Sequence, residues 1–217
     1  MTALEPYYDD GTVRLYVGDC RRVLPELDPA AFAVLAGDPP YGIGYRSGQY
    51  GTLPRSILGD ESTLIRDAAL EWWGSRPALV FGSWKIPRPA STRMRLVWDT
   101  KGANGMGALD LPWKPSDQEI YVLGRGFHGR RDSNVLRFAP VQSLARNGRV
   151  HPHEKPVDLM RALLLKCPPG AVIDPWCGSG PTLRAAKDLG RPAVGIELEE
   201  RWCEQAARRL AQEVLAV

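Results

Sequence analysis

The sequence predicts an α/β fold, with a doubly wound, mostly parallel sheet and helices on both faces. Short apolar runs alternate with segments of helical period near both ends of the chain, which is typical of such sheets. Several of these runs end at an acidic residue, and one of them continues into a glycine-rich turn and a helix. Because parallel sheets bind their ligands at the carboxyl ends of the strands, we expect these features along one edge.

The N-terminal part reads as strand, helix, strand, helix, strand. The expected strands cover residues 12–19, 32–38 and 77–81. We expect a helix over residues 60–73. Asp60 or Ser62 would cap this helix, and Gly74 follows its end.

The C-terminal part is the most regular. Helices are expected over residues 156–166 and 181–189 and from about residue 199, and strands over residues 171–174 and 192–197. The middle part, residues 84–150, is rich in Gly, Pro, Arg and Trp and offers strands only at 94–98, 119–123 and 135–138. We therefore expect long functional loops between these strands.

The composition fits a single globular domain spanning residues 1–217, with 44% hydrophobic residues. The sequence shows no signal peptide and no apolar run of about 18 residues, so we expect a cytoplasmic protein without a membrane segment. Four dispersed cysteines form no C-x-x-C pair and three histidines form no H-E-x-x-H pattern. We therefore expect reduced cysteines and no metal site.

Charge is unevenly distributed along the chain. Residues 85–150 contain 12 Lys and Arg against 5 Asp and Glu, whereas the remaining residues contain 16 against 20. This asymmetry favours a scaffold with one surface that faces a polyanion, although a solvated basic face would give the same count.

A glycine loop follows the strand expected at residues 171–174. Gly178 and Gly180 lie at the turn between this strand and the next helix, and Glu197 ends the following strand, 19 residues after Gly178. A carboxylate at this place can accept hydrogen bonds from both hydroxyls of a ribose. The alternative is that these glycines only form a tight turn.

Asp174 at the mouth of this loop does not suit a pyrophosphate, because both are negatively charged. The third glycine of a dinucleotide motif is also missing, since Leu183 stands there. An acidic residue suits a ligand with an ammonium group. S-adenosylmethionine carries an ammonium, a sulfonium and a ribose, and it therefore suits both Asp174 and Glu197.

The tetrad Asp38, Pro39, Pro40 and Tyr41 stands at the end of an expected strand, on the same edge as the glycine loop. An aromatic amine is a weak nucleophile because its lone pair is delocalised into the ring. The Asp38 carboxylate and the Pro39 carbonyl can accept its two hydrogens and favour a more nucleophilic nitrogen. Tyr41 offers a ring on which an extruded base can stack. An ordinary turn at the end of a strand is the alternative.

Together these motifs resemble the DNA amino-methyltransferases, specifically the permuted beta group in which the catalytic tetrad precedes the cofactor loop. The tetrad at residues 38–41 matches the family motif without change. The cofactor motif, Asp-Pro-Phe-x-Gly-Ser-Gly-Thr-Thr, matches residues 174–182 except at Trp176 and Pro181. The resemblance implies a Rossmann-like methyltransferase sheet, S-adenosylmethionine as cofactor and double-stranded DNA as substrate.

The resemblance also assigns roles to two residues outside these motifs. Asp19 matches an acidic residue near the cofactor's adenine, and Lys155, in the stretch 151–156, matches a segment at its methionine end. Alternatively, Asp19 only ends a strand and Lys155 is a solvated cation at a helix start. The expected cofactor residues are Asp19, Lys155, Asp174, Pro175, Trp176, Cys177, Gly178, Gly180, Thr182 and Glu197.

The family places target recognition between the tetrad and the cofactor segment, here within residues 42–149. Residues 42–51 are rich in glycine and read as a mobile loop that closes over the flipped nucleotide, or alternatively as a disordered surface loop. The expected DNA contacts are Arg46, Arg125, His128, Arg130 and Arg131.

Three tryptophans, Trp84, Trp98 and Trp113, lie near the expected strand ends. They could be wedges or stacking platforms in DNA, but tryptophans in such places more often belong to the core, and we expect core positions.

The expected reaction is methylation of adenine N6 in DNA, because the tetrad begins with Asp rather than Ser. The alternatives are cytosine N4 methylation and a DNA-binding module with an inactive cofactor pocket. Methylation of RNA or of a protein glutamine is disfavoured by the motif order. The short recognition zone allows for a homodimer, and a restriction endonuclease, if present, would be a separate polypeptide.

Overall fold

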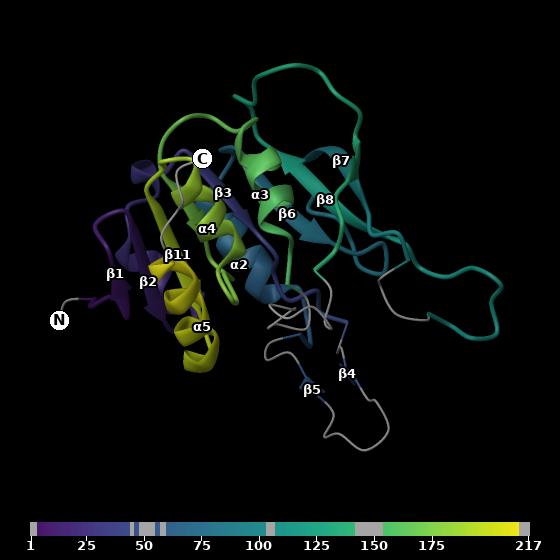
Figure 1. The fold of residues 1–217 in the computed structure, drawn as a ribbon, viewed down its shortest axis with the longest axis horizontal. Helices are drawn as coiled ribbons and strands as arrows, with labels where there is room; N and C mark the ends of the chain where they lie inside the picture. Colours follow the sequence, from purple (N-terminus) through teal and green to yellow (C-terminus); the bar gives the residue numbers. More distant parts are fainter. Residues whose placement is uncertain are drawn as a thin grey trace.

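The computed structural model describes residues 4–43, 46–47, 55–56, 60–102, 107–141 and 154–212. Within these residues one large sheet has the strand order β1-β2-β11-β10-β3-β6-β8-β7-β9 (Figure 1). Its strands are β1 (Tyr8–Asp9), β2 (Val13–Val17), β3 (Val34–Gly37), β6 (Ala78–Gly82), β7 (Thr92–Asp99), β8 (Asp117–Leu123), β9 (Val135–Arg137), β10 (Val172–Asp174) and β11 (Ala193–Glu197).

Most neighbouring strands are parallel. β2, β11, β10, β3 and β6 run in one direction, β8 runs antiparallel to β6, and β7 and β9 return to the common direction. We call the edge at which β2, β3, β6, β10 and β11 end the carboxyl edge, and the opposite one the amino edge. β7 and β9 also end at the carboxyl edge, whereas β8 begins there.

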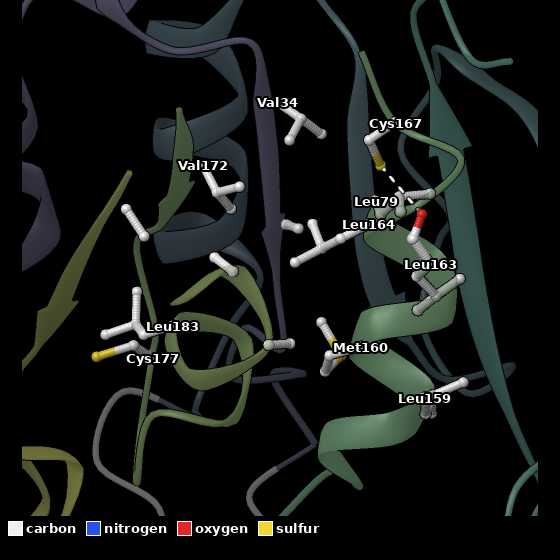
Figure 2. Packing of buried hydrophobic residues seen from close by; sticks show 14 of the residues in the cluster. Val34, Leu79, Leu159, Met160, Leu163, Leu164, Cys167, Val172, Cys177 and Leu183 are labelled. Carbon is white, nitrogen blue, oxygen red and sulfur yellow. Dashed lines mark hydrogen bonds between the residues drawn. The ribbon is translucent and has the colours of Figure 1, made fainter. Parts of the chain in front are cut away.

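Helices cover both faces of the sheet, as the sequence predicts. Alternation along β3 explains the two layers, because Val34 and Ala36 point into one apolar cluster and Leu35 into the other. The first cluster holds α3 (Val157–Leu164), α4 (Pro181–Asp188) and α5 (Glu200–Ala211), and Figure 2 shows its packing around α3. The second cluster holds α1 (Cys20–Val23) and α2 (Leu64–Trp73), with the short η1 (Leu24–Glu26) and η2 (Pro29–Ala31) following α1.

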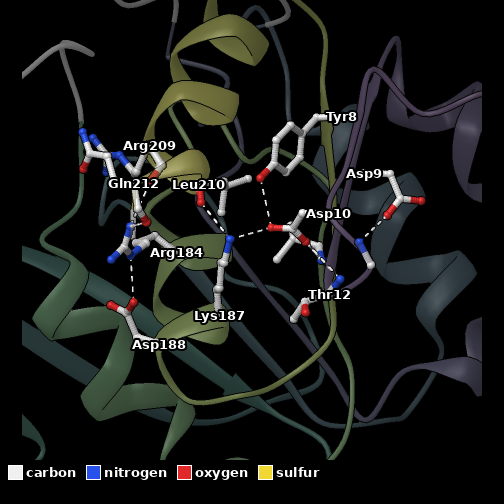
Figure 3. Close-up of polar contacts among 12 residues, drawn as sticks. Tyr8, Asp9, Asp10, Thr12, Arg184, Lys187, Asp188, Arg209, Leu210 and Gln212 are labelled. Atoms are coloured by element: carbon white, nitrogen blue, oxygen red, sulfur yellow. Dashed lines mark hydrogen bonds and ion pairs between the residues drawn. The ribbon is translucent and has the colours of Figure 1, made fainter. Parts of the chain in front are cut away.

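Polar contacts join α4 to α5 and to the turn between β1 and β2 (Figure 3). The Lys187 ammonium donates to Asp10 Oδ2 at 2.5 Å and to the Leu210 carbonyl at 2.8 Å. Arg184 donates to Asp188 at 2.7 Å and to the Arg209 carbonyl at 2.9 Å. These contacts fix the helix that follows the glycine loop against its neighbours.

The structure corrects some expected boundaries. α2 begins at Leu64 after Thr63, so neither Asp60 nor Ser62 is its N-cap. β7 is longer than expected because it pairs with β8 through Asp99. The loop expected at residues 42–51 lies largely outside the described residues. In the part that is described, β4 (Arg46–Ser47) pairs with β5 (Arg55–Ser56).

All four cysteines are free and buried, as expected. Over the described ranges, no helix combines the length and apolar character needed to cross a membrane.

Candidate active site

The carboxyl edge brings the tetrad, the glycine loop and three acidic side chains together. Asp38 follows β3, Asp174 ends β10 and Glu197 ends β11. β10 pairs with both β3 and β11, so these three carboxyl groups stand on adjacent strands, with Asp174 in the middle. The structure therefore brings the predicted catalytic and cofactor motifs to one place.

Glu197 organises the glycine loop through the backbone. Its Oε2 accepts from Gly178 N and its Oε1 accepts from Glu199 N, both at 2.9 Å. Burial raises the pKa of the Glu197 carboxyl, and these backbone donors oppose the rise. These two bonds, with a further backbone hydrogen bond from Leu198, hold the carboxylate fixed, and it keeps acceptor capacity for a ligand hydroxyl.

Asp174 is almost fully buried, with 2% of its surface exposed. Its Oδ1 accepts from Trp176 N at 3.1 Å, and Thr182 hydrogen-bonds to its side chain. Burial, together with the nearby Asp38 and Glu197 carboxyl groups, raises the pKa of Asp174 to about 7, although the hydrogen bonds from Thr182 and Trp176 oppose the rise. A cationic ligand group beside Asp174 would stabilise its ionised form.

Two glycines outside the motif leave the space that this arrangement needs. A Cβ at Gly37, in β3, would collide with Asp174 Oδ1. A Cβ at Gly195, in β11, would collide with Leu183 and approach Cys177 Sγ to 3.0 Å. Only glycine lets the strands approach the cofactor loop this closely.

The rest of the glycine loop matches its expected geometry. Gly180 N donates to the Cys177 carbonyl at 2.8 Å, and Gly180 adopts a left-handed conformation at the N-cap of α4. Pro181 occupies the first turn of this helix, where its missing N–H costs nothing. Pro175 and Cys177 are buried, and Trp176 packs against the second apolar cluster.

The tetrad carboxylate has a partner on each oxygen. The Tyr41 hydroxyl donates to Asp38 Oδ1 at 2.6 Å, and the Lys155 ammonium lies against Oδ2. Lys155 is buried and sits 4.9 Å above the centre of the Phe81 ring. Burial and the adjacent Asp38 raise the pKa of Tyr41 well above its ordinary value, so its hydroxyl stays protonated. Lys155 is therefore a buried ion-pair partner of Asp38 and not a solvated cation.

A buried carboxylate positions the segment after the tetrad. Asp60 accepts from Gly42 N at 2.7 Å, and Gly42 has a positive φ of 76°. A side chain at position 42 would collide with the backbone of Ser62. Asp60, expected as a helix cap, thus belongs to the support of the tetrad.

Glu154 was not predicted as a site residue, although it precedes Lys155. Its carboxylate accepts from Ser179 Oγ at 3.2 Å and pairs with Arg209 of α5 at 2.6 Å. This contact connects the segment that carries Lys155 to the glycine loop. The sequence could not have indicated this role of Glu154. Its partner Arg209 is distant in the sequence and looks like an ordinary charged residue of an amphipathic helix.

Asp19 lies at the carboxyl edge just after β2 and caps α1, accepting from Arg21 N at 2.9 Å. Its carboxylate also pairs with the Arg21 guanidinium at 2.5 Å, which lowers the pKa of Asp19 although burial opposes this. Asp19 therefore has a local structural role as the cap of α1, and it lies at the same edge of the sheet as Asp38, Asp174 and Glu197.

These residues fit a cationic cofactor. Asp38, Asp174 and Glu197 face the site from adjacent strands, while Lys155 supplies the opposing charge against Asp38. The carboxylates of this group outnumber its cations. A ligand with an ammonium and a sulfonium would balance this charge, and Glu197 can accept hydrogen bonds from a ribose.

The predicted DNA contacts after β8 lie elsewhere. β8 runs toward the amino edge, so the loop that carries Arg125, His128, Arg130 and Arg131 is on the side opposite the tetrad, at the top of Figure 1. His128 N donates to the Lys166 carbonyl at 3.0 Å, and Lys166 binds the Arg130 carbonyl. The structure therefore does not bring these four residues next to Asp38. The Arg46 side chain, His151 and His153 lie outside the described residues.

The tryptophan expectation was wrong for two of the three residues. Trp98 is buried in β7 and donates to the Phe138 carbonyl at 2.9 Å. Trp84 and Trp113 are 75% and 78% exposed. Both stand in loops beyond the strand ends at the carboxyl edge, where no helix of the described residues covers them.

Known proteins of similar sequence are DNA methylases. The sequence profile of the DNA methylase family N6_N4_Mtase matches residues 83–208. The type II methyltransferase M.ScaI of Streptomyces caespitosus is 34% identical over 257 aligned positions, covering 96% of this chain and 84% of that protein.

Solved structures show the same fold at low sequence identity. The cytosine-N4-specific PvuII DNA methyltransferase has a TM-score of 0.69 at 14% identity, covering 99% of this chain and 92% of its own. The M1.HpyAVI–SAM complex has a TM-score of 0.64 at 18% identity, covering 91% and 99%. The profile match over more than half of the sequence decides the assignment: the chain belongs to the family of DNA methylases that modify adenine at N6 or cytosine at N4.

Proposed function

We propose that this protein transfers a methyl group from S-adenosylmethionine to the exocyclic amino group of a flipped base in double-stranded DNA, namely adenine N6. The observation that carries the proposal is the position of Asp38, which stands between Tyr41 and Lys155 and next to the strand that ends in Asp174. A base acceptor and a cationic methyl donor can thus meet at one edge of the sheet.

The protein's own groups perform the positioning. The Asp38 carboxylate and the Pro39 carbonyl would accept the two amino hydrogens of the base, which favours a nucleophilic lone pair on nitrogen. Tyr41 and Lys155 hold the carboxylate in place, and Tyr41 offers its ring to the base. Bound S-adenosylmethionine supplies an electrophilic methyl group. Alignment of the two partners contributes much of the rate.

We assign the cofactor contacts by chemistry. Asp174 would face the ammonium group of the cofactor, and Glu197 would face its ribose hydroxyls. Gly178 and Gly180 would let the ligand approach the backbone closely. Asp19 would lie toward the adenine end. Lys155 is assigned to Asp38 rather than to the methionine end, because its ammonium contacts that carboxylate.

Adenine is favoured over cytosine because position 38 is Asp. The same geometry would serve cytosine N4, so this is the second candidate for the target. We further propose that residues 42–149 contain the target-recognition loops and that the protein acts beside a separate restriction endonuclease, which its similarity to a type II methyltransferase supports. Self-association as a homodimer remains a prediction.

The test is incubation with labelled S-adenosylmethionine and mixed-sequence duplex DNA, followed by nucleoside digestion and mass spectrometry. N6-methyldeoxyadenosine supports the proposal, whereas N4-methyldeoxycytidine keeps the mechanism and changes the base. DNA binding without any methylated nucleoside would support the binding-module alternative. Asp38→Asn should abolish the product, and Asp158→Asn, an exposed substitution in α3, should not.

A further inference from the structure

The loop between β7 and β8 displays apolar side chains to solvent. Leu109, Leu111 and Trp113 are 82%, 57% and 78% exposed. Three large apolar side chains within five residues form a patch of the kind that marks an interaction surface. We call residues 107–116 the β7–β8 loop, and Figure 1 shows it extending from the sheet at the right of the view.

The base of this loop is well ordered by local contacts. Thr100 N donates to the Ser116 carbonyl at 2.8 Å, which closes the hairpin beyond the last β7–β8 pair. Leu111 N donates to the Ala108 carbonyl at 3.2 Å. Gly107 lies against the Pro115 ring so closely that a Cβ would collide with it. The apolar side chains are thus held outward by a folded hairpin end.

The loop lies on the same edge as the tetrad. Gly82 pairs with Glu119 and Asp99 with Asp117, so β7 ends and β8 begins where β6 and β3 end. In the order β3-β6-β8-β7 three strand spacings, or about 14 Å, separate the tetrad strand from β7.

The charges around the patch suit a polyanion. Lys101, which follows β7, and Lys114, within the β7–β8 loop, are both exposed, and a Cβ at Gly102 would lie 3.8 Å from Lys114 Nζ. The neighbouring loop after β6 adds exposed Trp84, with the Lys85 ammonium 5.9 Å from the centre of its ring. Over residues 83–91 and 100–116 there are four basic residues against one acidic residue, Asp110. Apolar side chains flanked by lysines are complementary to DNA, because the apolar groups can contact bases while the lysines contact the phosphates on either side.

We propose that the β7–β8 loop is a DNA wedge, in which Trp113 enters the base stack beside the flipped nucleotide while Lys101 and Lys114 contact the phosphates. The proposal rests on the proposed function, because extrusion of a base leaves a gap in the stack that an aromatic ring can fill. Leu109 and Leu111 shield this contact from water. The partner is duplex DNA.

The test measures binding of a labelled mixed-sequence duplex by fluorescence anisotropy across a salt series. Trp113→Ala should weaken binding about 10- to 100-fold, the range for the loss of one base–aromatic stack, and Trp113→Phe should restore most of it. Lys101→Gln with Lys114→Gln should make the slope of log affinity against log salt shallower by about 2. Thermal unfolding of each variant should match that of the wild type, since these side chains are exposed.

The matched control is the pair Arg130→Gln and Arg131→Gln, which removes the same charge from the amino edge. It should leave the salt slope unchanged. A flattened slope for the arginine pair alone would place DNA on the amino edge and overturn the proposal. Unchanged duplex binding by Trp113→Ala, or no duplex binding by the wild type, would also overturn it.

Sedimentation of the wild type and of Trp113→Ala measures their oligomeric states, and so tests whether a second copy of the chain covers the patch instead of DNA. If the variant dissociates a wild-type dimer and still binds duplex normally, the patch contacts a second copy of the chain and the wedge is rejected. Failure of the wedge hypothesis and failure of the proposed function are distinguished by mass spectrometry of DNA that the wild type has been incubated with. Loss of the wedge alone leaves methylated nucleosides in place, whereas their absence refutes the proposed function.

Discussion

The Lys155 ammonium lies against Oδ2 of Asp38, although 117 residues separate the two along the chain. Lys155 is buried, and it rests over the Phe81 ring of β6. The Asp38 carboxylate is thus ion-paired by the segment that directly precedes the glycine loop. This pair leads to the first prediction.

Lys155→Met should lower kcat about 10²-fold, which is the lower end of the range for losing a group that takes part in general acid–base catalysis. The Kd for S-adenosylmethionine should change less than threefold. Methionine keeps the apolar contact with Phe81 and removes the charge. Single-turnover methylation and calorimetry measure the two quantities. Lys166→Met, two residues after the end of α3, is the control. A large rise in Kd with normal kcat would return Lys155 to the methionine end of the cofactor.

Glu197→Gln should weaken cofactor binding by about 10- to 100-fold, because hydrogen bonds to a charged acceptor contribute ~1.5–3 kcal/mol. The amide also places a donor against Gly178 N or Glu199 N, which both donate to this side chain in the wild type. Calorimetric titration with S-adenosylmethionine measures the loss. Unchanged affinity would exclude Glu197 from the ribose site.

Asp174→Asn should make the cofactor-free protein more stable at pH 8 than the wild type. The carboxyl has a pKa of about 7 in the folded protein against an ordinary 3.8, so the folded state binds the proton more tightly. The stability that this tighter proton binding adds to the folded state is fully present below about pH 4 and is lost as the pH rises through about 7. At about 1.36 kcal/mol per pH unit the loss is at most roughly 4 kcal/mol.

Urea unfolding of both proteins at pH 5 and pH 8 tests this sign. The wild type should lose more stability than the variant between these two pH values. Equal losses would show that Asp174 is ionised at little cost. The same variant should bind S-adenosylmethionine weakly, because the ammonium group then lacks its carboxylate.

Gly37→Ala should destabilise the protein by ~1–3 kcal/mol and impair cofactor binding, because the new Cβ displaces the Asp174 carboxyl group. Gly190→Ala is a matched comparison. Gly190 has a φ of 65° and open space around it, so strain costs a similar ~1–2 kcal/mol while the cofactor site stays intact. Equal cofactor affinity in the two variants would contradict the role of Gly37.

Much of the fold could be predicted because its signals are local. Residues 171–197 alternate between apolar runs and helical segments, and β10, α4 and β11 lie where this pattern places them. Asp38, Asp174 and Glu197 meet because each ends a parallel strand, and the periodicity indicated those strand ends.

The remaining features depend on strand direction and on contacts between distant residues. The antiparallel β8 carries Arg125 and its neighbours to the amino edge, and local sequence does not encode a strand's direction. The same applies to Glu154, which meets Ser179 and Arg209 only in three dimensions. Trp113 resembles a core residue by type, and its exposure follows from the absence of a covering helix in the described structure.

The hydrogen bond from Gly42 to Asp60 closes the neck of the intervening segment at 2.7 Å. Because the neck is fixed, the entropy of closing this segment grows only slowly with its length, by about 0.6 kcal/mol per doubling. Insertions or exchanges between these two residues would leave the tetrad in place. Segments of other length or sequence could therefore replace the intervening segment and, under the proposed function, alter the contacts to DNA while residues 38–41 keep their positions.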